Sequence, residues 1–376
     1  MKILNTVFWL DKGEVDGLTG KGPVLIVPWR CTFGCDSGCI HCTSAGKSAC
    51  ADEIDTKDAK IMVDQISDFG ASFFGITGGQ PFLRKDLFEV LDYATKKGLS
   101  TSIITDGRML DEKAFQNIVK NQTKISVSID GNEATNDAIR GKGAYKAAVT
   151  LIEKLVRENL LNVLVYTFAN GNGFSNVNEE DMRHVLDLAK RFGARWVVFH
   201  GMIPYSSDKA SLKADPTPAQ YEWLCNKLYD LTQEYDGKPA INVYIPFYAR
   251  VVKQRGMSDY EKWYNGFFLG RCFFGKFFSV AENGDAIPCS YNDAIRIGNI
   301  KNKPLKQIWQ EMQDSEFYTK IRDKSNLKGK CGLCEYKDLC GGCRSSALFY
   351  TGDIFGSDPR CIYIPKALRQ KAKPKE

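Results

Sequence analysis

The chain has 376 residues, of which 51 are Lys or Arg and 45 are Asp or Glu, so its formal net charge is +6. Hydrophobic residues make up 43% and charged residues 26%. This balance is typical of a soluble protein and argues against a disordered chain, a collagen-like repeat or an array of membrane spans. The basic residues form no stripe or recognition motif, so we expect no nucleic-acid partner.

Six strand patterns, each followed by a helical pattern, occupy the chain from residue 23 to residue 235. The segment 1–22 before them has no signal-peptide pattern and no apolar run long enough for a membrane span, so we expect a cytoplasmic protein without a membrane partner. Strands are predicted at Val24–Pro28, Ala71–Ile76, Ser100–Ile104, Lys124–Ile129, Asn162–Phe168 and Arg195–His200. Helices are predicted at Thr56–Phe69, Asp86–Lys97, Glu112–Val119, Tyr145–Glu158, Glu179–Phe192 and Pro218–Tyr235.

This alternation predicts an α/β fold, a partial TIM-like (β/α)6 barrel in which helices cover a parallel sheet. Functional residues are expected on the loops that follow the strands. His200, at the end of the sixth strand, is one candidate. After residue 235 the pattern changes, and we expect a linking region over 236–271 followed by a small cysteine-rich domain over 272–376. Short strands at Phe277–Ala281 and Ala286–Pro288 and a helix at Pro304–Lys320 are predicted there.

The 13 cysteines are concentrated in two stretches, five over residues 31–50 and seven over residues 272–361. In a reducing compartment such clustering indicates metal or redox chemistry more often than disulfides. Cys35, Cys39 and Cys42 form a C-x3-C-x2-C motif, whose thiolates could bind three corners of a [4Fe–4S] cluster. A zinc site that uses the histidine of this loop is the alternative, and the spacing favours iron–sulfur.

Three further motifs follow predicted strands. Thr77–Pro81 reads TGGQP, Ile104–Gly107 reads ITDG, and Ser126–Gly131 reads SVSIDG with Arg140-Gly141 beyond it. Together with the cysteine motif, and in this order, they resemble the motifs of the radical S-adenosylmethionine (SAM) superfamily. The resemblance implies a [4Fe–4S] cluster that binds SAM, held by Cys35, Cys39 and Cys42. It also implies a SAM site formed by Gly78, Gly79, Gln80, Ser128, Asp130 and Arg140.

Two features depart from the superfamily pattern. Cys31 lies four residues before Cys35, so it is a second candidate for the first cluster ligand. We prefer the register that starts at Cys35, because the C-x-H-C segment at 39–42 then keeps its usual spacing. Gln80 stands where the superfamily usually has Glu. A neutral amide makes only an ordinary hydrogen bond with the ammonium group of SAM, so we expect weaker SAM binding.

The C-terminal cysteines form a second pattern. It contains two C-x2-C pairs, Cys331/Cys334 and Cys340/Cys343. In a zinc ribbon a dozen or more residues separate two such pairs, whereas only five separate them here. The series, with Gly298-Asn299-Ile300 after Cys289, resembles the SPASM domain, an auxiliary iron–sulfur module of many radical SAM enzymes. This implies two auxiliary clusters. The outer one would be held by Cys331, Cys334, Cys340 and Cys361, and the inner one by Cys272, Cys289 and Cys343, with no obvious fourth protein ligand.

The segments Cys340–Arg344, Thr351–Asp353 and Asp358–Cys361 resemble most closely one branch of the superfamily. It includes maturases of pyrroloquinoline quinone and mycofactocin precursor peptides and radical enzymes of alternative haem synthesis. The resemblance implies a radical SAM oxidoreductase in which a 5′-deoxyadenosyl radical takes hydrogen from the substrate and the auxiliary clusters support an oxidation. We expect a ribosomally made peptide as substrate, with a tetrapyrrole as the alternative. A non-catalytic iron–sulfur or zinc protein is a third possibility.

Two partners follow from this interpretation. Reductive cleavage of SAM needs an external electron donor such as ferredoxin or flavodoxin. Because residues 1–22 are too few for a fused peptide-recognition domain, a peptide substrate implies either direct binding or a separate recognition protein.

Overall fold

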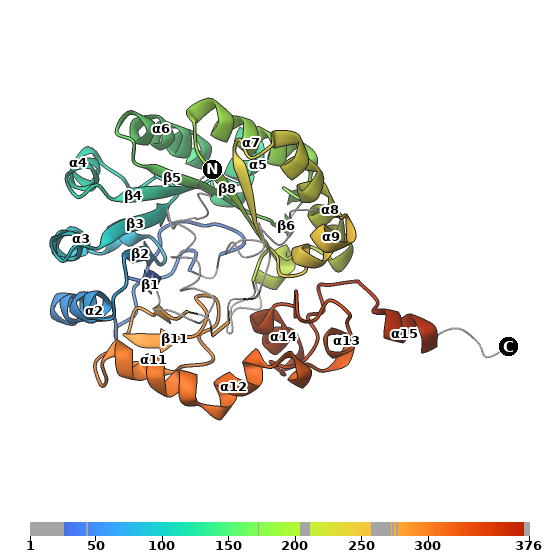
Figure 1. Ribbon diagram of the computed structural model, residues 1–376. Helices are drawn as coiled ribbons and strands as arrows, with labels where there is room; N and C mark the ends of the chain where they lie inside the picture. Colours follow the sequence, from blue (N-terminus) through green and yellow to red (C-terminus); the bar gives the residue numbers. More distant parts are fainter. Residues whose placement is uncertain are drawn as a thin grey trace.

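The computed structural model describes residues 26–42, 44–171, 173–203, 211–256, 272, 274–275 and 277–371 (Figure 1). Seven parallel strands follow one another across a curved sheet, and each of the six predicted strands is present. They are β1 (Ile26–Arg30), β2 (Phe73–Thr77), β3 (Ser100–Thr105), β4 (Lys124–Ser128), β5 (Leu161–Thr167), β8 (Trp196–His200) and β9 (Ala240–Tyr244). The expected α/β partial barrel is therefore confirmed, and β9 extends it beyond the six units that were predicted.

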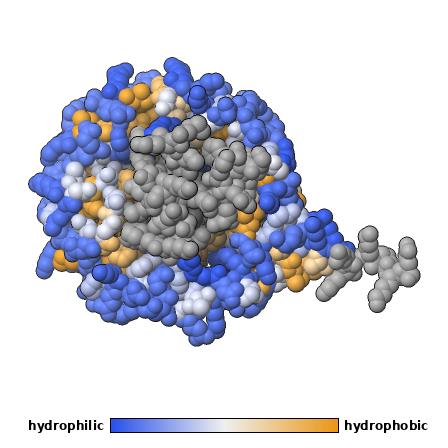
Figure 2. Space-filling model, in the orientation of Figure 1, coloured by the Kyte–Doolittle hydropathy of each residue, from blue (hydrophilic) through white to orange (hydrophobic). Residues whose placement is uncertain are grey.

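Helices cover the outer side of this sheet (Figure 1). They are α2 (Thr56–Asp68), α3 (Leu87–Lys96), α4 (Glu112–Lys120), α5 (Glu133–Arg140), α6 (Ala144–Arg157), α7 (Glu179–Phe192), α8 (Pro218–Tyr235) and α9 (Tyr248–Gln254). α7 begins after Asn178, whose side chain accepts a hydrogen bond from the N–H of Asp181, and ends at Gly193 in the left-handed region. The rim of the molecule is largely hydrophilic (Figure 2), as expected for helices with one face in solvent.

The two faces of the sheet have different packing partners. Val197 and Phe199 of β8 belong to the large core that the helices share with the sheet. Because successive side chains of a strand alternate in direction, Val198 faces the opposite way, into the interior of the barrel. There it forms a separate small cluster with Val163, and Trp196 and Tyr244 pack against it.

The C-terminal region is joined to the barrel through the same sheet. β10 (Ser279–Val280) pairs in parallel with β1, and β11 (Asp285–Ile287) and β12 (Gly298–Asn299) continue the sheet antiparallel. The remaining helices are α11 (Leu305–Asp314), α12 (Glu316–Arg322), α13 (Gly329–Gly332), α14 (Arg344–Thr351) and α15 (Lys366–Lys371). The helix predicted at Pro304–Lys320 is in fact two helices, because the Ser315 side chain caps α12 by accepting from the N–H of Tyr318.

Part of the region 236–271, predicted to link the two domains, has regular secondary structure. β9 and α9 lie within it, and β9 pairs with β8 along its whole length, from Trp196↔Ala240 to His200↔Tyr244. The strand is short, and the neighbour that stabilises it is about 40 residues away, so its sequence alone did not distinguish it from a loop. Residues 257–271 lie outside the described part of the chain. In the described part, no helix is both long and apolar enough to cross a membrane.

Candidate iron–sulfur and cofactor site

The loop after β1 folds back on itself and carries the first cysteine motif. The N–H of Cys35 donates to the carbonyl of Lys47, and the N–H of Cys42 donates to that of Cys39. Burial raises the pKa of the Cys39 thiol to about 11, and the neighbouring Cys42 adds to the rise. Burial likewise raises the pKa of Cys42, with a contribution from Cys35. The structure thus places these three thiols close enough to influence one another.

Cys31 has a different environment. It is fully buried in the main core, and burial raises the pKa of its thiol to about 12. Its charged neighbours are Arg84, Glu53 and Asp86 rather than the other thiols of the loop. The structure thus places Cys31 among the core side chains, and the ligand register that starts at Cys35 stays a prediction.

Gly78 and Gly79 hold the loop against β2. The N–H of Gly79 donates to the carbonyl of Thr32, and the N–H of Gln80 donates to that of Gly34. A Cβ atom on Gly79 would lie 2.1 Å from the carbonyl oxygen of Gly34, and one on Gly78 would lie 2.5 Å from that of Thr32. Glycine is therefore required at both positions, because any side chain would push the cluster loop away.

Gln80 is only 3% exposed, and its Oε1 accepts a long hydrogen bond of 3.4 Å from the Thr105 hydroxyl. Replacing Gln80 with glutamate should tighten SAM binding. A charge-assisted hydrogen bond is roughly twice as strong as a neutral one, so we expect a gain of about 1 kcal/mol, or roughly fivefold in affinity. Equilibrium binding of SAM to the reconstituted protein measures it, with the exposed Gln116→Glu as control. An unchanged or weaker affinity would contradict the prediction.

Asp130 and Arg140 form a buried network with the cluster loop. The Asp130 carboxylate accepts from the N–H of Thr167 at 2.7 Å and contacts Nε2 of His41 at 3.1 Å and Nε of Arg140 at 2.7 Å. Burial acts to raise the pKa of Asp130, but the charges of Arg140 and then His41 outweigh it and lower the pKa to about 2. With no exposed surface, Asp130 positions His41 and Arg140. The SAM contacts that the resemblance implies for Asp130 and Arg140 stay a prediction.

The contacts of two residues near the cluster motif were not predicted from the sequence, which considered His41 only as a zinc ligand. His41 lies between Cys39 and Cys42 and connects the loop to Asp130. Arg108 follows the TDG motif, pairs with Asp106 at 2.5 Å, and its Nη2 lies 3.9 Å from the Cys39 sulfur. Ser128, the remaining predicted SAM residue, is buried at the C-terminal end of β4. The spacing of His41 within the cysteine motif was a signal that could have identified it.

The C-terminal cysteines lie in two neighbourhoods, and their assignment to two clusters stays a prediction. One recess is lined by all four cysteines assigned to the outer cluster, together with Arg250 and Tyr363. The three assigned to the inner cluster neighbour one another. Burial raises the pKa of Cys289 to about 12, and Cys343 and Cys272 add to that rise.

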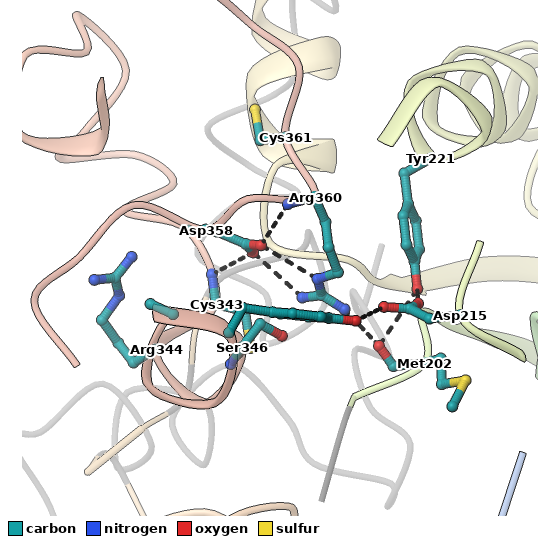
Figure 3. Close-up of polar contacts among 12 residues, drawn as sticks. Met202, Asp215, Tyr221, Cys343, Arg344, Ser346, Asp358, Arg360 and Cys361 are labelled. Carbon is teal, nitrogen blue, oxygen red and sulfur yellow. Dashed lines mark hydrogen bonds and ion pairs between the residues drawn. The ribbon is translucent and has the colours of Figure 1, made fainter. Parts of the chain in front are cut away.

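A buried polar network joins the two cysteine sets to the barrel (Figure 3). Asp358 accepts from the N–H of Cys343 at 2.9 Å, and its carbonyl accepts from the N–H of Cys361. Arg360 pairs with Asp358 and also donates to the carbonyl of Met202, which follows β8. The network therefore fixes the auxiliary region relative to the C-terminal ends of the barrel strands.

His200 lies at this same end of the barrel, as its position in the sequence predicted. Its ring stacks on Tyr244 with centroids 4.5 Å apart, and its Nδ1 is 3.5 Å from the hydroxyl of Tyr291. Burial lowers the pKa of His200 to about 4, so the imidazole is neutral at pH 7. Tyr291 lies two residues after Cys289, and its backbone acts against the rise in the pKa of that thiol, so Tyr291 connects the barrel interior to the inner cysteine set. Sequence spacing gave no signal for Tyr291.

Comparison with known proteins supports the same interpretation. The sequence profile of the radical SAM superfamily matches residues 29–189, and that of the SPASM iron–sulfur cluster-binding domain matches residues 272–343. An AdoMet-dependent heme synthase from Methanosarcina barkeri is 31% identical over 90% of this chain and 97% of its own length. The mycofactocin maturase MftC from Mycolicibacterium smegmatis is 26% identical over 95% of this chain and 88% of its own.

Solved structures share the fold. Streptococcus suis SuiB bound to S-adenosylmethionine has a TM-score of 0.70 at 16% identity, covering 90% of this chain and 77% of that one. The enzyme anSMEcpe with bound AdoMet and a peptide has a TM-score of 0.67 at 17% identity, covering 90% and 94%. The protein described here therefore belongs to the radical SAM superfamily, as an enzyme that binds SAM at a [4Fe–4S] cluster and carries auxiliary iron–sulfur clusters in a C-terminal SPASM domain.

Proposed function

We propose that this enzyme oxidises a tetrapyrrole by decarboxylating a propionate side chain. The observation that carries the proposal is the 31% identity, over nearly the full length of both chains, to a relative named as a heme synthase. Two further relatives with that name are 29% and 27% identical. These identities exceed those of the mycofactocin maturases, which are 26% at most among the relatives compared.

The interior of the barrel suits a planar, largely apolar substrate. Val163, Val198, Trp196 and Tyr244 form an apolar and aromatic surface on the inner face of β5, β8 and β9. The ring pair of His200 and Tyr244 is nearly parallel, with 16° between the planes. Such a flat face can stack on an aromatic macrocycle. Because His200 is neutral at pH 7, it and Tyr291 offer hydrogen bonds without adding charge.

SAM and the clusters supply, when bound, a hydrogen-abstracting radical and an acceptor for one electron. The propionic acid side chain releases its carboxyl proton to solvent and loses a hydrogen atom from the carbon next to the ring. It then loses carbon dioxide and one electron, which leaves a vinyl group and removes two hydrogens in all. The residues of the chain hold the reacting carbon: the aromatic face orients the macrocycle, and His200 with Tyr291 fixes its edge beside the inner cysteine set.

A peptide substrate, which we expected from the sequence, is the second candidate. The mycofactocin maturases favour it, since MftC of Mycolicibacterium smegmatis aligns over 95% of this chain. An electron acceptor beside the barrel interior would serve the oxidation of a peptide side chain equally well.

Anaerobic turnover of the reconstituted enzyme tests the proposal. With SAM, dithionite and Fe-coproporphyrin III, we expect formation of 5′-deoxyadenosine and loss of carbon dioxide and two hydrogens from the porphyrin, detected by mass spectrometry. Formation of 5′-deoxyadenosine without porphyrin product, combined with conversion of a precursor peptide encoded beside the gene, would contradict the tetrapyrrole assignment and favour the peptide.

The same assay examines His200. In His200→Ala we expect SAM cleavage to continue while product per 5′-deoxyadenosine falls about tenfold, because losing a positioning contact of about 1.4 kcal/mol uncouples the radical from the substrate. Replacement of His184, which bonds Tyr145 between two outer helices, is the matched control and should leave this ratio unchanged. A ratio unaffected in His200→Ala would contradict its proposed contact with substrate.

A further inference from the structure

The first turn of α14 contacts each of the three thiols assigned to the inner auxiliary cluster. The N–H of Arg344 donates to the sulfur of Cys272 at 3.4 Å. The hydroxyl of Ser345 donates to the sulfur of Cys289 at 3.4 Å, and the N–H of Ser346 donates to the sulfur of Cys343, also at 3.4 Å. Three thiols from separate segments of the chain therefore converge on three consecutive residues of one helix.

The hydroxyl of Ser346 provides a second, independent observation. Ser346 is fully buried, and its Oγ has no hydrogen-bond partner. The N–H of the same residue donates to the sulfur of Cys343, so the hydroxyl lies beside this thiol. Buried hydroxyls in proteins are normally hydrogen-bonded, so an unpartnered one beside a cluster ligand indicates an acceptor that binds there. A sulfur atom of an iron–sulfur cluster is such an acceptor.

We propose that the first turn of α14 tunes the inner auxiliary cluster, and that the hydroxyls of Ser345 and Ser346 are positioning residues that raise its reduction potential. Reduction adds a negative charge to the cluster. Hydrogen bonds to the sulfurs, and the positive end of a helix, stabilise the reduced form more than the oxidised form. This device favours acceptance of an electron, whichever substrate the enzyme oxidises.

Two contacts hold this turn in place. The guanidinium of Arg344 is almost fully buried, and its Nη1 donates to the carbonyls of Ile354 and Gly356, both at 2.8 Å. Asp358 accepts from the N–H of Cys343, the residue that caps α14. These hydrogen-bond donors are therefore held in position before the cluster binds, so they can stabilise negative charge on the cluster without rearranging.

A redox titration followed by electron paramagnetic resonance tests the proposal. The full chain is used with Cys35, Cys39 and Cys42 replaced by alanine, so that only the auxiliary clusters contribute. The inner signal is identified as the one lost in Cys289→Ala. In Ser345→Ala and in Ser346→Ala, we expect the equilibrium constant for reducing the inner cluster to fall about tenfold, which for a one-electron couple is about 59 mV. The outer signal should not move.

Two further variants separate tuning from loss of structure. Ser345→Thr keeps the hydroxyl and should keep the wild-type potential and iron content. Thr351→Val removes a hydroxyl from the opposite end of α14, where it donates to the carbonyl of Ala347, and should change neither. Unchanged inner potentials in both alanine variants at full iron content would overturn the proposal. So would loss of the inner cluster in Ser345→Thr as well as in Ser345→Ala, since a hydroxyl would then not be what matters.

Discussion

Replacing Cys35 with alanine should abolish cleavage of SAM, whereas replacing Cys31 should leave the first cluster in place. Three thiolates hold three irons of a [4Fe–4S] cluster and leave the fourth open for SAM. A variant with only two of these thiols should lose the cluster. Cys31 lies fully buried among the apolar side chains of the main core, so we expect it to act as a core side chain and not as a cluster ligand.

Iron content and 5′-deoxyadenosine formation measure this result. In Cys35→Ala we expect the iron of one cluster to be lost and no 5′-deoxyadenosine above background. In Cys31→Ala we expect both to remain, with a loss of stability of about 1 kcal/mol for a small buried side chain. If Cys31→Ala abolished cluster loading while Cys35→Ala did not, the ligand register would be wrong.

Replacing Asp130 with asparagine should destabilise the protein strongly. The change leaves the buried guanidinium of Arg140 without its counter-charge and releases His41 of the cluster loop. Removing one partner of a buried ion pair typically costs about 3–5 kcal/mol. Chemical denaturation measures the loss, and iron content should fall as well because the loop is no longer held.

The matched control is Asp230→Asn. Asp230 pairs with Arg255 at 2.7 Å on the surface, where both side chains are well exposed. Exposed pairs contribute about 0–1 kcal/mol, so this variant should behave almost like the wild type. Equal losses in the two variants would show that the buried position of Asp130 is not what makes its charge important.

Asp130 should also contribute to the pH dependence of stability. Its pKa is lowered to about 2 in the folded protein, against about 3.9 for an unperturbed Asp. A lowered pKa stabilises the fold above the unfolded value, so this contribution is complete above about pH 4 and is lost as the pH falls towards 2. Denaturation at a series of pH values should show this loss of stability between about pH 4 and pH 2 in the wild type. If the same loss persisted in full in Asp130→Asn, groups other than Asp130 would be responsible for it.

The sequence was most informative where function depends on short-range spacing. The motif at Cys35, Cys39 and Cys42 lies within one loop, so its spacing alone places the thiols near one another. The six predicted strands were recognisable because each alternates with an amphipathic helix of ordinary length. Since parallel strands end at one edge of the sheet, the order of the motifs was enough to predict that TGGQP, TDG and SIDG meet the cysteine loop.

Other features depend on contacts between distant parts of the chain, and only the tertiary structure decided them. β9 is stable because β8 pairs with it, and Tyr291 reaches His200 across 91 residues of sequence. The role of Asp130 follows from its complete burial, which no local pattern reveals. The sequence by itself indicated the superfamily through the resemblance of its motifs and the fold class through its periodicity, because both can be recognised along the chain. The structure decided which charges are buried and which hydroxyls face the inner thiols, because burial is set by every element that packs around a residue.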